Sequence, residues 1–275
     1  MIPDRTASSK CWSRAQVWLA ISRLVSLGRR FYCSGMTRNL KYFGFRTALN
    51  SRQRSVLRRL ACALLILGSV SGIRAEDLVP LTPKLPAPAF AGTPKDAPEG
   101  TDVEAPTGKP RAPLMVPKDV KNLAPGSKVT TSDANATPAA IGKITDGDKE
   151  AVDTSIVLLR KGTQYVQFDL GAPSEIFAVL FWHAHDSPKV YRGVVVQVSD
   201  DPSFAQDVKT LFNNDKANTS GRGVGTDREY YESNEGKLVD AKGVKARYVR
   251  LYSHGSTDSA LNEYTEVEIY GRPAK

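Results

Sequence analysis

The chain has 275 residues, enough for one or two domains, and its formal net charge of +9 at pH 7 is typical of proteins that bind nucleic acids. The charge is unevenly distributed, however. Residues 1–75 contain 14 Lys and Arg and a single acid, Asp4, whereas the remaining 200 residues contain 24 bases and 28 acids, a net charge of −4. Since the basic excess belongs to the first 75 residues, the composition argues against a nucleic-acid partner for the rest of the chain.

The first 75 residues have the layout of a secretory signal peptide. Four arginines between positions 52 and 59 precede the eleven-residue apolar segment Leu60–Val70, and the small residue Ala75 offers a cleavage site. The apolar segment is about half as long as a membrane span requires. We therefore expect residues 1–75 to be a leader, and the mature protein to begin near Glu76 without a transmembrane span. It would be secreted, periplasmic or held at a cell surface; a short uncleaved anchor helix is the alternative.

Two further features concern this leader. Met36 is a candidate start, so residues 1–35 are interpreted as an over-extended start of the gene. All three cysteines, Cys11, Cys33 and Cys62, precede the expected cleavage point. The mature chain is therefore expected to contain neither a disulfide nor a thiolate metal site.

Residues 76–121 have a different composition. Eleven of the 17 prolines lie between Pro80 and Pro125, among Ala, Thr, Lys, Asp and Glu. Such a segment buries too little apolar surface to offset the entropy of ordering it. We expect a disordered, Pro-rich spacer; the alternative is a ligand for an aromatic groove.

From Asn122 onward the pattern is that of short strands. In Gln164–Leu170 polar and apolar residues alternate, which is typical of a half-buried strand, and the apolar run Ile176–His183 predicts a strand buried on both faces. Residues 171–174 between them have turn chemistry. The further predicted strands are an edge segment at Leu123–Ser132, then Gly193–Ser199, Val208–Phe212, Ala246–Tyr252 and Thr265–Tyr270. Six to eight strands without a long helix predict an all-β antiparallel sandwich over residues 122–275.

Five segments of this region resemble discoidin (F5/8 type C) domains in their order. They are FDLGAPSEI (168–176), FAVLFWH (177–183), VVVQVSDDPSF (194–204), ARYVRLY (246–252) and EVEIYG (266–271). The resemblance covers about Asn122–Arg272. It implies the galactose-binding-like jelly-roll sandwich, a superfamily that includes the family 32 carbohydrate-binding modules. The chain departs from common members in the long polar loop Asn213–Lys237 and in having no tryptophan near Asp146-Gly147-Asp148.

That acidic loop is the best candidate metal site. The carboxylates of Asp146 and Asp148 are hard oxygen ligands that suit Ca²⁺, and Gly147 permits a tight turn. The resemblance implies a structural Ca²⁺ where this loop meets the last strand, with Glu266 as a strand carboxylate and Thr265 offering its carbonyl. The alternative is a solvated turn.

The candidate ligand residues follow the strand ends. His183, His185 and Asp186 lie where a buried strand ends, and three interpretations stay open for them: a Zn or Cu site, hydrogen bonds to sugar hydroxyls, or packing alone. His254, Asn262 and Tyr264 belong to the late loop and the strand that follows it. Tyr230 and Tyr231 form an aromatic pair in the long loop, either of which could stack on a sugar ring. We expect these side chains to contact the ligand, because loops gather at the ends of a sandwich.

No catalytic motif is recognisable: the chain has no nucleophile elbow, and Gly221–Gly225 lacks the lysine and the strand-to-helix setting of a phosphate loop. We therefore expect a non-catalytic module that binds a glycan or glycoconjugate. An adhesion module of the same fold that binds a cell-surface protein or a lipid is the alternative. The polar late loop, HGSTDSALNEY (254–264), favours the sugar.

Overall fold

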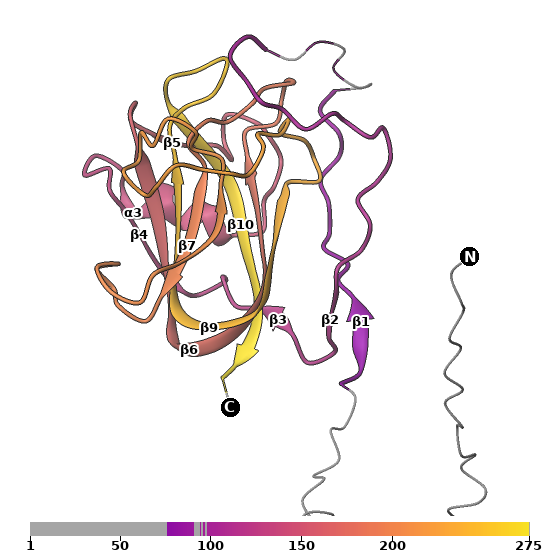
Figure 1. Ribbon diagram of the computed structural model, residues 1–275, viewed down its shortest axis with the longest axis vertical. Coiled ribbons are helices and arrows are strands. Elements are labelled where there is room, and N and C mark those ends of the chain that lie inside the picture. The colour runs from indigo at the N-terminus through magenta and orange to yellow at the C-terminus, as the bar shows by residue number, and fades with distance from the viewer. Residues whose placement is uncertain (1–75, 91–93, 95, 97, 275) are drawn as a thin grey trace, which may run out of the picture. The chain divides into compact units, whose positions relative to one another are not determined.

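The computed structural model describes residues 76–90, 94, 96 and 98–274, so the predicted signal peptide and start site lie outside the described residues. The described chain is an antiparallel β-sandwich (Figure 1). Its strands are β1 (Leu78–Pro80), β2 (Met115–Pro117), β3 (Lys121–Asn122), β4 (Lys128–Thr131), β5 (Val157–Leu159), β6 (Gln164–His183), β7 (Val195–Ser199), β8 (Lys209–Asn213), β9 (Lys237–Ser253) and β10 (Asn262–Pro273). Two short helices, α3 (Pro138–Gly142) and η1 (Lys143–Thr145), connect β4 to the loop before β5. No helix among the described residues is long and apolar enough to cross a membrane.

Two long strands, β6 and β9, form the centre of the sheet. The strand order is β3-β10-β6-β9-β7-β8, with β4 paired to β6 and β5 paired to β10. The first part of β6 pairs with β4 and with the end of β9, whereas its second part pairs with β10 and the start of β9. Register shifts between Asp169 and Ser174 mark the change. A strand that bends in this way contributes to both layers of a sandwich.

The core lies between these layers and is built from alternating residues. Val166 and Phe168 of β6, Val196 and Val198 of β7, and Ile269 of β10 are all fully buried. Their neighbours along the strands face outward in the first part of β6, as the period of two predicts. The all-β antiparallel sandwich predicted from the sequence is therefore confirmed.

The element bounds differ from the prediction in one instructive way. The two strands predicted at Gln164–Leu170 and Ile176–His183 are one continuous strand, β6. Gly171, at φ +81°, and the following residues bend the strand at the edge of the sandwich instead of reversing it. Its partner β9 also extends further than the predicted Ala246–Tyr252, because the same bend carries the pairing around the edge.

Residues 76–121 were predicted to form a disordered spacer, and the structure describes residues 76–90, 94, 96 and 98–121 of this segment. The described part of this segment contacts the sandwich through its backbone: Glu104 N donates to Glu229 O at 2.8 Å, and Glu229 N donates to Asp102 O at 3.0 Å. Arg111 adds hydrogen bonds to the carboxylate of Glu235. The described part of this segment is therefore held to the sandwich by hydrogen bonds and ion pairs.

The beginning of this segment, at Glu76, is bound to Arg272 near the end of the chain. β1 and β2 pair with each other in a separate two-stranded sheet. The guanidinium group of Arg272, in β10, forms ion pairs with Glu76, with Asp119 at 2.9 Å and with Glu175 at 2.7 Å. These carboxylates raise the pKa of Arg272 further above its usual range. One residue of the last strand therefore joins both ends of the proline-rich segment to the sandwich.

Candidate ligand-binding cleft

An open cleft of about 710 Å³ lies at the end of the sandwich where β6 begins and β9 ends. Three segments line it: Lys161-Gly162 between β5 and β6, Arg192 before β7, and His254 with residues 256–260 between β9 and β10. Each segment follows or precedes a strand of the core, so the rigid sheet sets where the loops begin and end. This is the kind of loop cluster in which sandwich proteins commonly place their binding sites.

The fully buried side chain of Asn262 holds two of these segments together. Its Nδ2 donates to the carbonyl oxygens of Arg160 at 2.7 Å and Gly162 at 2.9 Å. Its Oδ1 accepts from the Gly255 amide at 2.9 Å and from the Ser253 hydroxyl at 2.8 Å. We predicted Asn262 as a ligand contact; the structure places it beneath the cleft, where it fixes the backbone on both sides.

His254 is the one predicted histidine that lines the cleft. Its amide donates to Arg192 O at 2.8 Å, and Arg192 N donates to Gly255 O at 3.0 Å, so the two segments form a short ladder. The Nδ1 atom of His254 lies 2.8 Å from the hydroxyl of Thr163. The backbones approach closely at Gly193 (φ +60°), where a Cβ atom would lie 2.9 Å from that of His254. The imidazole is exposed but anchored on one side.

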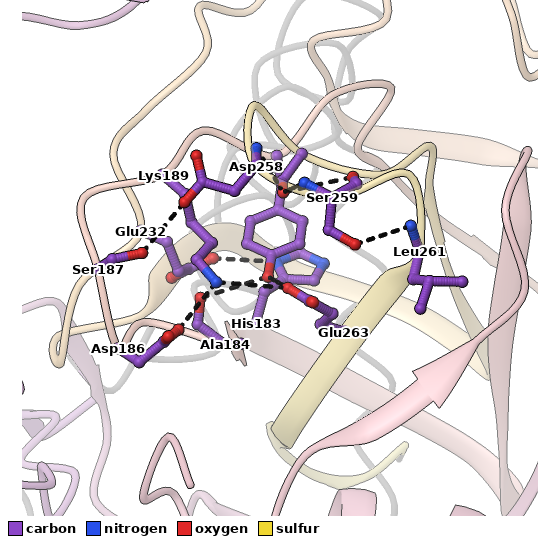
Figure 2. Close-up of polar contacts among 12 residues, drawn as sticks. His183, Ala184, Asp186, Ser187, Lys189, Glu232, Asp258, Ser259, Leu261 and Glu263 are labelled. Atoms are coloured by element: carbon purple, nitrogen blue, oxygen red, sulfur yellow. Dashed lines mark hydrogen bonds and ion pairs between the residues drawn. The ribbon is translucent and has the colours of Figure 1, made fainter. Parts of the chain in front are cut away.

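The charged groups of the cleft are mostly basic. Lys161 and Arg192 are both exposed, and neither forms an ion pair within the part of the chain that the structure describes. The one carboxylate in the lining, Asp258, accepts a hydrogen bond from the Ser187 hydroxyl at 3.2 Å (Figure 2). Neither Lys161 nor Arg192 was among the residues predicted from the sequence to contact a ligand. In the sequence, each is simply a basic residue near the end of a predicted strand, and many other residues of this chain fit the same description.

His183, by contrast, lies in the core. Its side chain is fully buried, and Nδ1 lies 2.9 Å from Oε2 of Glu232. The ring stacks on Tyr191, with the centroids 4.1 Å apart, and leans on Tyr264 at 4.6 Å. Figure 2 shows this imidazole beneath the loop that carries Asp258 and Ser259. The structure therefore corrects the predicted contacts: His183 and Tyr264 pack under the loops and do not line the cleft.

A network of charges continues from this core toward the surface (Figure 2). The Tyr191 hydroxyl donates to Glu263 Oε2 at 2.6 Å, and burial together with this carboxylate raises the pKa of Tyr191 far above its usual range. Lys189 lies 2.8 Å from Asp186 and 3.5 Å from Glu263. Burial lowers the pKa of Lys189, but these carboxylates outweigh it and the pKa is raised. Asp186, a predicted ligand residue, is thus half-exposed and ion-paired.

The remaining predicted ligand residues lie elsewhere. His185 is fully buried, with Nε2 2.9 Å from Lys149 O. Tyr230 is buried and its pKa is raised by burial, whereas Tyr231 is half-buried and donates to the carbonyl of Asp96. Both tyrosines line a second open cavity of about 880 Å³ against the proline-rich segment. The structure does not bring this pair together with His254.

Of the predicted metal ligands, Glu266 contacts the backbone of the acidic turn, whereas the carboxylates of Asp146 and Asp148 form other hydrogen bonds. Glu266 is buried, its Oε2 accepts from the Gly147 amide at 3.1 Å, and burial raises its pKa to about 8. The carboxylates of Asp146 and Asp148 are largely used locally: Asp146 accepts from the Asp148 amide, and Asp148 accepts from Ser155. Among the described residues, no three His, Cys, Asp or Glu side chains converge on one point. Thr265 is buried beside Glu266.

Comparisons with known proteins gave matches among solved structures. No protein-family model matches the sequence, and no curated protein matches it. Among solved structures, a family 89 glycoside hydrolase from Clostridium perfringens is 15% identical, with a TM-score of 0.42 over 56% of this chain; the match spans 15% of the hydrolase. The CBM32 module of AlyQ, in complex with 4,5-unsaturated mannuronic acid, is 20% identical, with a TM-score of 0.37, over 52% of this chain and 92% of the module. A Streptococcus pneumoniae fucose-binding module is 14% identical, with a TM-score of 0.37, over 55% of this chain and 97% of the module.

Proposed function

We propose that this protein is a non-catalytic carbohydrate-binding protein that acts outside the cell and holds a saccharide in the cleft between His254, Arg192 and Lys161. The observation that carries the proposal is the cleft itself, whose backbone is held by the buried Asn262. A site whose loops are already ordered loses little conformational entropy when a ligand binds. The CBM32 module of AlyQ is described in complex with a saccharide, and the S. pneumoniae module as fucose-binding. These ligands are properties of those two proteins, and it is the cleft of this chain that supports the proposal.

The lining suits a hydroxyl-rich ligand. Arg192 supplies several N–H donors in a planar fork, and the imidazole of His254 can donate or accept. The hydroxyl of Ser259 accepts from the Leu261 amide and can still donate to a ligand, while Gly162 lets a ligand approach the backbone. Saccharides present donors and acceptors at many positions, so a set of mixed groups in one cleft matches their chemistry.

The lining supports binding better than hydrolysis. Glycoside hydrolysis generally uses two carboxyl groups that flank the scissile bond. Within the described residues the cleft contains one carboxylate, Asp258. We therefore propose that the protein binds its saccharide without cleaving it.

One observation favours the alternative, an adhesion module for lipid or protein. Leu158 is 56% exposed and Leu261 is 38% exposed, and both lie close to the cleft, at the junction of β5 and β10. Exposed apolar side chains on such loops can enter a membrane surface or a protein groove. Anionic vesicles therefore belong in the same binding experiment as the glycans.

We also propose that Ca²⁺ binds beside the Asp146–Asp148 turn. The residues are compatible with a hard cation because Glu266 is buried near Asp146 and Glu268, with the ion pair of Lys149 and Glu268 offsetting part of this negative charge. The site would combine Glu266 with backbone carbonyls of the turn and of Thr265, since the carboxylates of Asp146 and Asp148 already accept local hydrogen bonds.

The direct test is a glycan array probed with the full chain and with a His254→Ala variant. We expect saccharides to bind the full chain and to bind the variant several-fold more weakly, as the loss of one hydrogen bond predicts. Lys121→Gln changes an exposed base at the opposite end of β10 and serves as the control. Binding to anionic vesicles with no signal on the array would contradict the proposal and favour the adhesion module.

A further inference from the structure

The two basic side chains of the cleft outnumber its one carboxylate, Asp258, and neither forms an ion pair with it. Lys161 and Arg192 come from two different loops and form no ion pair with any other described residue. The nearby carboxylate of Asp258 accepts a hydrogen bond from Ser187. Its negative charge also contributes to the raised pKa of the buried Lys189, so it acts on Lys189 as well as on the two bases of the cleft. Residues 76–275 carry an excess of acids over bases, which makes a cleft with two unpaired bases a local exception.

The cleft also offers no aromatic platform. Its lining residues include no Phe, Tyr or Trp, and the imidazole of His254 is the single ring among them. The two tyrosines nearest to the lining in sequence, Tyr191 and Tyr252, are both buried, and Tyr252 lies under the cation of Arg222 and against Tyr165. Binding of a neutral sugar commonly uses an aromatic face against the apolar side of the ring. This cleft must obtain its affinity and its selectivity from polar contacts.

Charge-assisted hydrogen bonds are the strongest polar contacts available to these residues. Hydrogen bonds to charged groups are about twice as strong as neutral ones. An arginine can bind a carboxylate or a sulfate through two parallel N–H donors, and a lysine adds a point charge. Small neighbours such as Gly162 and Ala260 leave room for such a group beside the two cations.

From these observations we infer that the saccharide held by this cleft is acidic and that its carboxylate or sulfate group lies against Arg192 and Lys161. This inference rests on the proposed function and narrows it to one class of saccharide. A uronic acid supplies a carboxylate and a sulfated sugar supplies a sulfate ester, and both present the same anionic oxygens to the two bases.

The experiment compares each acidic saccharide with its own neutral derivative. The full chain is titrated with oligogalacturonate and with the same oligomer after methyl esterification, and with a sulfated galactan and its desulfated form. We expect the acidic member of at least one pair to bind about tenfold or more tightly than its neutral derivative, and the affinity to fall as salt rises from 50 to 500 mM, as screening predicts. The pair that shows the difference identifies the source of the charge.

Two variants locate the interaction. Arg192→Gln and Lys161→Gln keep a polar side chain with an N–H donor but shorten it and remove the charge, and each is expected to reduce the affinity for the acidic saccharide about tenfold. The control Lys121→Gln is expected to bind like the unchanged protein. Equal binding of acidic and neutral forms, or charge preference that survives both variants, overturns the inference and leaves the proposed function standing. Absence of any saccharide binding overturns both.

Discussion

The imidazole Nδ1 of His183 lies 2.9 Å from the carboxylate Oε2 of Glu232, and neither side chain has any exposed surface. This pair joins the end of β6 to the long loop before β9. Within the described structure, His183 Nε2 and Glu232 Oε1 have no hydrogen-bond partner. A buried polar pair of this kind tolerates the loss of one partner poorly, because the other is left desolvated and unpaired.

Glu232→Ala is therefore expected to destabilise the fold by about 3 kcal/mol, since it leaves His183 unpaired and opens space in the core. Urea unfolding followed by fluorescence measures this change. His183→Ala is expected to have a similar effect and to leave saccharide affinity unchanged at temperatures where the variant remains folded. A variant of His183 with normal stability and weakened binding would return this residue to the binding site.

Asn262→Ala is expected to weaken saccharide binding several-fold although Asn262 touches no ligand. Its four hydrogen bonds hold the Arg160–Gly162 and Ser253–Gly255 segments, so their loss releases both sides of the cleft. We also expect a loss of about 2 kcal/mol in unfolding free energy, because buried backbone carbonyls lose their donor. Calorimetric titration and thermal melting measure the two effects. Asn135→Ala, at an exposed asparagine, is the control that should change neither.

Removal of residues 76–119 is expected to lower the melting temperature by several degrees. The deletion removes the partners of Glu229, Glu235 and Arg272 on the sandwich. A change of 1 kcal/mol shifts the melting temperature of a domain of this size by about 2–4 °C. Differential scanning calorimetry of the full and shortened proteins provides the measurement. Identical melting curves would mean that the segment contributes nothing to stability.

Calcium is expected to raise the melting temperature of the protein, because a ligand that binds only the folded state stabilises it. Glu266→Gln should abolish this increase. In the presence of a chelator the same variant should be at least as stable as the unchanged protein, since it replaces a buried carboxyl group by a neutral one. If calcium and chelator give the same melting curve for the unchanged protein, the acidic turn is not a calcium site.

Asp169 is expected to contribute a pH-dependent share of the stability. The guanidinium of Arg247 binds both of its oxygens, at 2.7 and 2.9 Å, and this interaction lowers the pKa of Asp169. A carboxyl group with a lowered pKa in the folded state stabilises the fold above its unfolded pKa, near 4, and this contribution is lost as the pH falls through the folded value. Asp169→Asn should cost about 1 kcal/mol at pH 7 for this partly exposed pair and progressively less at pH 3 and below. An equal cost at both pH values would show that charge is not involved.

The sequence predicted the layers of this fold well because strand periodicity is a local property. Residues in the first part of β6 alternate in the printed sequence as they do in the sandwich. The bend within β6 was harder to predict, because Gly171 and Pro173 have the same local preferences in a reversing turn and in a bent strand. Only the pairing with β9 on both sides of the bend distinguishes the two.

The site was predicted less well than the fold. His254 was identified because it follows a clear strand, whereas His183 and Tyr264 were assigned to the same surface although both are buried. Their polar character suggested exposure, but Glu232, 49 residues away in the sequence, supplies a buried partner for His183. The position of Arg192 in the lining of the cleft was not predicted, for a related reason. Its position beside His254 depends on a ladder between two loops that are distant in sequence.

The ion pairs of Arg272 determine on which side of the domain the first described residues lie. β10 begins with Asn262 under the cleft and ends beside Arg272, which holds Glu76 at the far end of the sandwich (Figure 1). The first and the last described segments thus leave the domain from the same side, away from the cleft. A protein tethered through either segment would therefore direct its cleft away from the tether.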